Sequence, residues 1–252
     1  MPTSPARVHP RFLAPDLDPA AAEVRLPADE SRHLTRVLRL GAGALVSVFD
    51  GRGHECLATV VAAHDARVAL RVIEQIAPVA EPVVPLTLIA AVLKGAAMDD
   101  VVRDATMMGA VRIQPVLTEH VAVKPSIAAR AENVERWRRV AIASAKQSRR
   151  ATVPEVMAPV AFETAMSLQH AGLRVMFVEP SARRETRPVR SLANRPPPSH
   201  VTLLVGPEGG WAAGEIDLAS QQGALLVSLG TLTLRADAMA VAAIAVLRTL
   251  WE

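Results

Sequence analysis

Hydrophobic and polar residues follow two different patterns along this chain of 252 residues. Up to about residue 77, short β-prone runs at 23–26, 44–49, 56–62 and 67–73 are separated by glycine-containing turns. This pattern is typical of a small β-rich domain such as a mini-barrel. From residue 86 on, apolar runs alternate with helical patterns. Such alternation predicts an α/β domain with a parallel sheet covered by helices on both faces.

The change of pattern predicts two domains, 1–77 and 86–252, joined by the proline-rich linker PVAEPVVP at 78–85. In the second domain we expect strands at 86–93, 111–117 and 173–178, and helices at 98–108, 129–147 and about 237–250. The stretch 181–200 is rich in arginine and ends in three prolines. It is interpreted as an exposed loop.

One helical pattern interrupts the β-rich domain, in the segment DESRHLTRVLRL at 29–40. It places Leu34, Val37 and Leu38 on one face and its arginines largely on others. Further arginine-rich stretches lie at 136–150 and 183–190. Three such clusters favour a phosphate-rich partner, RNA or DNA, although arginines also coat ordinary solvated helix faces. Because aromatic residues make up only 3% of the chain, arginine contacts rather than base stacking are expected to carry binding.

The composition excludes several other classes of protein. The single cysteine, Cys56, excludes an internal disulfide framework and a multi-cysteine metal site, and we interpret it as a small buried side chain. We therefore expect no metal. No signal sequence is visible at the N-terminus, and the apolar run 238–247 is too short to span a bilayer, so we expect a cytoplasmic protein without membrane contact. The common dinucleotide, P-loop, serine-hydrolase and zinc-peptidase motifs are absent.

Two apolar runs end abruptly in glycine-containing loops, VTLLVGPEGGW at 201–211 and LLVSLGTLTLRAD at 225–237. Each loop is followed by a helical pattern. In open α/β sheets, ligands bind just beyond the carboxyl ends of such strands, and glycines allow the backbone to approach a ligand closely. Taken alone, the first loop is also compatible with a tight strand-to-helix turn that binds nothing.

These two loops, with three further segments in the same order, resemble the RsmE family of the SPOUT methyltransferases. The further segments are SRHLTRVLRLGAG, LKGAAMDDVVRDATMMGAVRIQPVLTEH and AIASAKQSRRATVPEV. The resemblance implies a SPOUT-type parallel sheet with a trefoil knot, preceded by a small PUA-like RNA-binding β-barrel domain. It also implies S-adenosylmethionine as cofactor, a homodimer, and methylation of N3 of a uridine in 16S ribosomal RNA, within the assembled 30S subunit.

The resemblance further assigns roles to individual residues. The implied catalytic residues are Arg235, Glu208 and Asp237. Residues implied to bind the cofactor are Leu204, Gly206, Pro207, Glu208, Gly209, Gly210, Leu229, Gly230, Leu232 and Leu234. The predicted RNA-binding residues are Arg32, His33, Arg36 and Arg39, from the basic helical segment itself, and Lys94, Gln147, Arg149 and Arg150 in the segments that resemble the family.

The chain departs from the family pattern at several positions. It has Ala236-Asp237-Ala238 where the family often has Thr-Glu-Thr, and Lys146 where a glutamate is common. Asp237 is either a catalytic carboxylate or the N-cap of the last helix. Glu208 is either a proton acceptor or a carboxylate that only orders its loop, and His33 either contacts RNA or is partly buried. Two alternatives stay open: a non-catalytic RNA-binding or ribosome-assembly factor, and a methyltransferase that acts on another RNA.

Overall fold

The computed structural model describes residues 9–64, 66–168, 172–182 and 184–251, and these form two compact units. The first unit contains the chain up to Ala80 together with the segment Ala145–Val153. The second contains Glu81–Ser144 and Pro154–Glu252. The segment Ala145–Val153 thus makes its contacts in the first unit, although its sequence pattern continues that of the α/β domain. The domain limits 1–77 and 86–252 stay a prediction.

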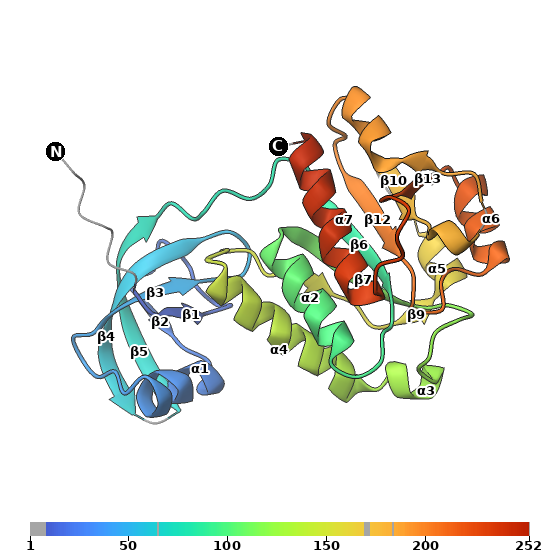
Figure 1. Ribbon diagram of the computed structural model, residues 1–252. Helices are drawn as coiled ribbons and strands as arrows, with labels where there is room; N and C mark the ends of the chain where they lie inside the picture. Colours follow the sequence, from blue (N-terminus) through green and yellow to red (C-terminus); the bar gives the residue numbers. More distant parts are fainter. Residues whose placement is uncertain (1–8, 65, 169–171, 183, 252) are drawn as a thin grey trace. The chain divides into compact units, whose positions relative to one another are not determined.

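Five strands form the sheet of the first unit, in the order β1-β3-β4-β5-β2 (Figure 1). All neighbours are antiparallel except β1 and β3, which pair in parallel. The predicted β-rich N-terminal domain is therefore confirmed, while β1 was not predicted. The strands are β1 (Arg11–Leu13), β2 (Glu23–Arg25), β3 (Leu45–Phe49), β4 (Glu55–His64) and β5 (Arg67–Ile76).

A short helix, α1 (Ala28–Arg32), continues into a π-helical turn, η1 (His33–Val37). Leu34, Val37 and Leu38, which the helical pattern places on one face, differ in burial. Leu34 is fully buried, but Val37 is 65% and Leu38 40% exposed. The amide of Leu38 donates to the carbonyl of His33, five residues back. Because this turn is wider than an α-helical turn, residues three and four positions after Leu34 no longer lie on its face.

The second unit is built on a parallel sheet in the order β11-β13-β10-β12-β6-β7-β8, with β9 pairing with β7. Figure 1 labels the strands of this sheet other than β8 and β11. Every strand pair recorded in it is parallel, which confirms the predicted sheet type. Its strands are β6 (Leu86–Ala91), β7 (Ala110–Leu117), β8 (Glu155–Val156), β9 (Val160–Ala161), β10 (Leu173–Phe177), β11 (Arg187–Pro188), β12 (Val201–Val205) and β13 (Leu225–Ser228).

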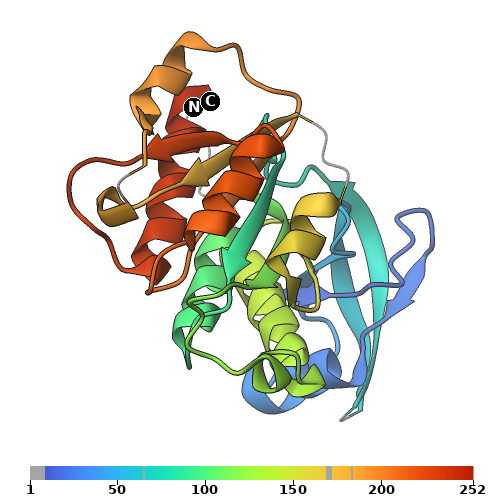
Figure 2. The ribbon, with the colours of Figure 1, turned by 90° about the vertical axis from the view of Figure 1, so that its right-hand side faces the viewer.

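Helices cover both faces of this sheet. On one face α2 packs against α7, and on the other α5 packs against α6 (Figures 1 and 2). The helices are α2 (Ala97–Met107), α3 (Pro125–Ala128), α4 (Ala131–Gln147), α5 (Phe162–Ser167), α6 (Ala213–Gln221) and α7 (Ala236–Trp251). The stretch 181–200, expected as a loop, contains the edge strand β11 and the short helices η2 (Pro180–Ala182) and η3 (Val189–Asn194).

Strand β12 is central to this unit, and all five of its residues are buried. It lies between β10 and β6, and helices cover both of its faces. This position explains why its sequence, VTLLV, is almost continuously apolar. Nowhere in the described parts of the chain is there a helix both long and apolar enough to cross a membrane.

Candidate functional site

A pocket of about 340 Å³ opens in the second unit where the neighbouring strands β10, β12 and β13 end. This is the edge of a parallel sheet where small ligands usually bind, and the volume suits a cofactor. The lining residues are Phe177, Glu179 and Ser181 at and after the end of β10, Val205 to Gly210 at the end of β12, Thr233, Leu234 and Arg235 between β13 and α7, and Ala236 and Met239 in the first turn of α7.

The glycines of the GPEGG loop are required by the space around them. Gly210 has a φ of +73°, and a Cβ atom there would lie 2.1 Å from an Oε1 atom of Glu179. A Cβ atom at Gly209 would lie 2.9 Å from the Cβ of His120. An L-residue at Gly210 is therefore disfavoured both by backbone strain and by collision with a side chain of the pocket wall.

Trp211 fixes the far end of the same loop in the core. Its indole nitrogen donates to the carbonyl of Phe177 at 2.9 Å, and its ring packs against Phe162 with centroids 5.1 Å apart. Glu215, in the first turn of α6, accepts hydrogen bonds from the amides of Ala212 and Glu119, both at 2.9 Å. These contacts join the loop to β10, α5 and the segment after β7. The first pocket wall is therefore rigidly supported.

The second wall comes from the loop between β13 and α7, and only part of the predicted set lines it. Leu234 is among the lining residues, whereas Leu229, Gly230 and Leu232 are not. Leu232 is 80% exposed. Leu204, also assigned to the cofactor, is fully buried in the core beside Trp211. The roles of these four residues stay predictions.

Two of the predicted catalytic residues form an ion pair at this wall. Nε of Arg235 lies 3.2 Å from Oδ1 of Asp237, and Nη2 lies 3.1 Å from Oδ2. The arginine lines the pocket, while Asp237 stands in the first turn of α7 and is not among the lining residues. Glu208, the third predicted residue, lines the pocket and is exposed. Of the two carboxylates, Glu208 is thus the one at the pocket surface.

Sequence reasoning missed two polar residues of the pocket region. Glu179 lines the pocket two residues after the end of β10. Nδ1 of His120 lies 3.2 Å from the carbonyl oxygen of Gly210. A carboxylate directly after the apolar run 173–178 was the available signal for Glu179, because that run ends at the same sheet edge as the glycine loops. For His120 the sequence carried no comparable signal.

The residues predicted to bind RNA lie on three separate segments. Arg32, His33, Arg36 and Arg39 are all exposed, on α1, η1 and the turn that follows. Lys94 is exposed in the loop after β6 of the second unit. The arginine cluster 183–190, which was not assigned a role, has Arg184, Arg187 and Arg190 exposed, while Arg183 lies outside the described residues.

The third segment, Gln147 to Arg150, belongs to the first unit. Gln147 and Arg149 are exposed, and Arg149 has a φ of 65°, a left-handed conformation that is uncommon for a residue with a side chain. Arg150 is only 5% exposed. In this conformation Gln147 and Arg149, rather than Arg150, are the side chains available to a ligand.

Cys56 behaves as the sequence predicts, as a buried structural side chain. Burial raises the pKa of its thiol, and the nearby charges of Asp50 and Glu55 raise it further. The thiol is therefore protonated at neutral pH and is a poor nucleophile. Among the residues that the structure describes, no group of three or more His, Cys, Asp or Glu side chains is arranged to hold a metal ion.

Known protein families match sequence in both units of the chain. Residues 80–248 match a family model described as an RNA methyltransferase domain, and residues 26–73 match an RNA methyltransferase PUA domain. A ribosomal RNA small subunit methyltransferase E from Synechocystis is 34% identical over 92% of this chain and 74% of its own length. Its namesake from Mycobacterium bovis is 28% identical over 96% of this chain and 93% of its own.

Solved structures give the same result over nearly the whole chain. A ribosomal RNA small subunit methyltransferase E from Neisseria gonorrhoeae, bound to S-adenosyl methionine, superimposes with a TM-score of 0.86 at 29% identity, covering 97% of this chain and 98% of that one. A putative methyltransferase from Legionella pneumophila with bound cofactor SAM gives 0.85 at 27% identity, covering 96% and 98%. The chain therefore belongs to the RsmE family of RNA methyltransferases.

Proposed function

We propose that this protein methylates small-subunit ribosomal RNA, with S-adenosylmethionine as the methyl donor. The observation that carries the proposal is the pocket at the ends of β10, β12 and β13, in a chain that closely matches a protein bound to S-adenosyl methionine. The names of the curated relatives support small-subunit ribosomal RNA as the substrate. The enzyme class is thus an RNA methyltransferase.

The lining of the pocket fits this cofactor. Phe177, Val205, Leu234 and Met239 offer apolar contacts to an adenine ring, and the carboxylate of Glu179 can accept hydrogen bonds from ribose hydroxyls. Gly206 to Gly210 let the backbone approach closely. When bound, S-adenosylmethionine supplies a methyl group attached to a positively charged sulfur. The remaining chemistry belongs to the residues of this chain.

At a finer level, we propose N3 of a uridine in 16S ribosomal RNA as the methyl acceptor. This nitrogen carries a proton at neutral pH, which must leave before or during transfer. Arg235 lines the pocket, which supports a role for it in stabilising the negative charge that develops on the uracil oxygens. Glu208 is the better candidate to accept the proton, because it is exposed at the pocket while both oxygens of Asp237 are engaged by Arg235.

Other parts of the proposal follow from family membership. They are a homodimer, an assembled 30S subunit as the natural substrate, a cytoplasmic location, and a trefoil knot in the second unit. RNA contacts are assigned to the exposed arginines of 32–39, to Lys94, and to Gln147 and Arg149. Binding through such contacts predicts an affinity that falls steeply as salt increases.

Two rivals remain distinct from this proposal. The departure Ala236-Asp237-Ala238 favours a non-catalytic RNA-binding or assembly factor, since it removes two hydroxyls, one of them at Ala236, which lines the pocket. A methyltransferase acting on another RNA is the nearer alternative.

The test is methyl transfer from labelled S-adenosylmethionine to small subunits from a strain lacking the gene, followed by mapping of the modified base. We expect label at N3 of one uridine, and loss of that label with Arg235→Ala. If the protein bound the cofactor but left small subunits unlabelled, small-subunit ribosomal RNA would be rejected as the substrate. Label at another atom or in another RNA would identify a different methyl acceptor. If the protein did not bind the cofactor at all, the alternative of a non-catalytic RNA-binding or assembly factor would be supported.

A further inference from the structure

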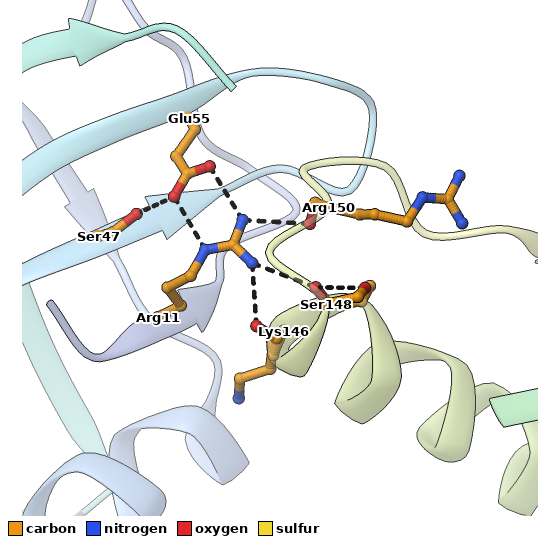
Figure 3. A network of polar contacts seen from close by, with 7 residues as sticks. Arg11, Ser47, Glu55, Lys146, Ser148 and Arg150 are labelled. Carbon is orange, nitrogen blue, oxygen red and sulfur yellow. Dashed lines mark hydrogen bonds and ion pairs between the residues drawn. The ribbon is translucent and has the colours of Figure 1, made fainter. Parts of the chain in front are cut away.

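Arg11, in the first strand of the chain, uses all five of its guanidinium N–H groups (Figure 3). Nε and Nη2 donate to the two carboxylate oxygens of Glu55, both at 2.9 Å. Nη1 donates to the carbonyls of Ala145 at 3.2 Å and Lys146 at 3.1 Å. The second hydrogen of Nη2 goes to the carbonyl of Arg150 at 3.1 Å. One side chain thus connects β4 with the segment around residues 145–150.

This ion pair is buried and its polar groups are satisfied. The side chains of Arg11 and Glu55 are 7% and 8% exposed. The hydroxyl of Ser47 also hydrogen-bonds to Glu55, and the guanidinium lies over the ring of Phe49 at 4.6 Å (Figure 3). A bidentate, fully bonded guanidinium is geometrically specific in a way that an ammonium group cannot be.

The three carbonyls that Arg11 reaches lie on either side of a strained turn. Ala145 and Lys146 are in the last turn of α4, where carbonyls lack partners within the helix. Arg150 follows Arg149, whose φ of 65° costs free energy. Contacts of the surrounding residues must offset this cost for the conformation to persist. Arg11 therefore holds both ends of the turn that contains Gln147 and Arg149.

The side chain of Lys146 makes a second contact that fixes the same turn. Nζ of Lys146 donates to both carboxylate oxygens of Glu30 in α1, each at 2.7 Å, and also lies 5.6 Å from the ring centre of Phe12. The ring of Phe12 also lies near that of His33, with ring centroids 6.1 Å apart. The turn 147–150 is therefore anchored beside the segment that carries the exposed residues Arg32 and His33.

We infer that Arg11 is a positioning residue for RNA: through its five hydrogen bonds it fixes the turn 147–150 so that Gln147 and Arg149 extend the basic surface of α1 and η1. The two segments then form one RNA-binding surface within the first unit. Arg11 itself does not touch RNA, because it is buried and its donors are used. The inference rests on the proposed function, since it names residues that recognise the same RNA.

The test compares wild type with Arg11→Lys, which keeps the charge but loses the planar fork. Binding of small-subunit ribosomal RNA is measured by filter binding, and kcat and KM are measured on small subunits. We expect Arg11→Lys to raise the RNA Kd and KM about tenfold, because Gln147 and Arg149 lose their fixed position and their contacts with RNA weaken. The kcat and the affinity for S-adenosylmethionine should not change.

A double-mutant cycle separates positioning from general destabilisation. If Arg11 acts through the turn, Arg11→Lys should change the RNA Kd less than about twofold once Arg149→Ala is present. Arg71→Lys, an exposed arginine on β5, is the matched control and should leave the Kd unchanged. Additive effects in the cycle would overturn the inference. The inference would also be overturned if Arg11→Lys lowered the proportion of folded protein but left the RNA Kd of the folded fraction unchanged.

The two proposals fail in distinguishable ways. If wild-type protein binds ribosomal RNA but transfers no methyl group, the proposed function fails while the Kd measurements still decide the role of Arg11. If methyl transfer occurs and Arg11→Lys leaves both Kd and KM at the wild-type value, the proposed function stands and the inference about Arg11 is rejected.

Discussion

Arg235 and Asp237 form a two-point ion pair across a single intervening residue, with N–O distances of 3.2 and 3.1 Å. The arginine side chain is 82% exposed, whereas the carboxylate is 22% exposed. Such a pair contributes little to stability because the arginine remains solvated. The two-point contact does align the guanidinium of Arg235 with the carboxylate of Asp237 at the pocket wall. The two residues therefore act as a unit rather than as independent catalytic groups.

The first prediction concerns the Arg235–Asp237 ion pair. Arg235→Ala should lower kcat/KM for methyl transfer about a hundredfold, as loss of a group that stabilises transition-state charge does. Asp237→Asn should lower it about tenfold, because the arginine loses its orientation. The double variant should be no slower than Arg235→Ala alone. Steady-state kinetics on small subunits checks all three.

The control for this prediction is another ion pair in the second compact unit of the chain, formed by residues that do not line the pocket. Arg184 pairs with Asp217 of α6 at 3.0 Å, and Asp217→Asn should leave kcat/KM unchanged. If Asp237→Asn were slower than Arg235→Ala, Asp237 would be the proton acceptor and not a residue that orients the arginine.

The second prediction tests the packing of the GPEGG loop. Gly210→Ala would force a left-handed conformation on an L-residue and place its Cβ 2.1 Å from Glu179. Since Glu179 must then move in the pocket wall, we expect the Kd for S-adenosylmethionine to rise about tenfold or more, which calorimetry measures. Gly214→Ala in α6 is the matched control, because a Cβ there meets nothing within 4 Å. An unchanged Kd for Gly210→Ala would remove the loop from the cofactor site.

Parts of this site could be predicted from the sequence because local patterns determine them. An apolar run followed by GPEGG indicates a buried strand that ends in a loop, and a run followed by LRAD does the same. Since the carboxyl ends of parallel strands meet at one edge, Gly206, Glu208 and Arg235 were expected near one another. All three line the pocket.

The remaining features depend on contacts between residues far apart in the chain. Glu179 reaches the pocket because β10 lies between β12 and β13, a strand order that no local pattern specifies. Arg11 contacts carbonyls 134 to 139 residues away, so the helical pattern of 129–147 gave no sign that its end joins the first unit. The different burial of Leu34 and Val37 could not be foreseen, because helical periodicity assumes an α-helix and the chain forms a π-helical turn there.

A third prediction concerns the pH dependence of stability in the hairpin between β3 and β4. Asp50 has its side chain 1% exposed and accepts hydrogen bonds from the amides of Arg52 and His54 and from the His54 ring. Burial alone would raise the pKa of Asp50, but the hydrogen bonds from His54 and Arg52 outweigh it and lower the pKa below its usual value. Its contribution to stability is therefore present above about pH 3.9, the unfolded pKa, and is lost as pH falls through the lower folded pKa.

Asp50→Asn measures this contribution. We expect it to lower the free energy of local opening by about 2 kcal/mol at pH 6, because hydrogen bonds to a charged acceptor are lost, and the difference from wild type should shrink below about pH 4. Hydrogen exchange of peptides from 44–64 reports on this hairpin. Asp16→Asn, at an exposed position, should have no effect at either pH. A difference that grew towards acid pH would contradict the assigned sign.

The last prediction concerns Arg248, which stabilises the second unit from the end of α7. Its side chain is buried and donates to the carbonyls of Met108 at 3.1 Å, Val84 at 2.5 Å and Gly109 at 2.9 Å. Arg248→Lys cannot satisfy this planar set, so we expect the free energy of unfolding to fall by about 3 kcal/mol. Arg190→Lys, exposed on η3, should change it by less than about 0.5 kcal/mol. Urea unfolding followed by fluorescence of Trp137, Trp211 and Trp251, all in this unit, measures the change. Equal midpoints for the two variants would show that these carbonyls find other partners.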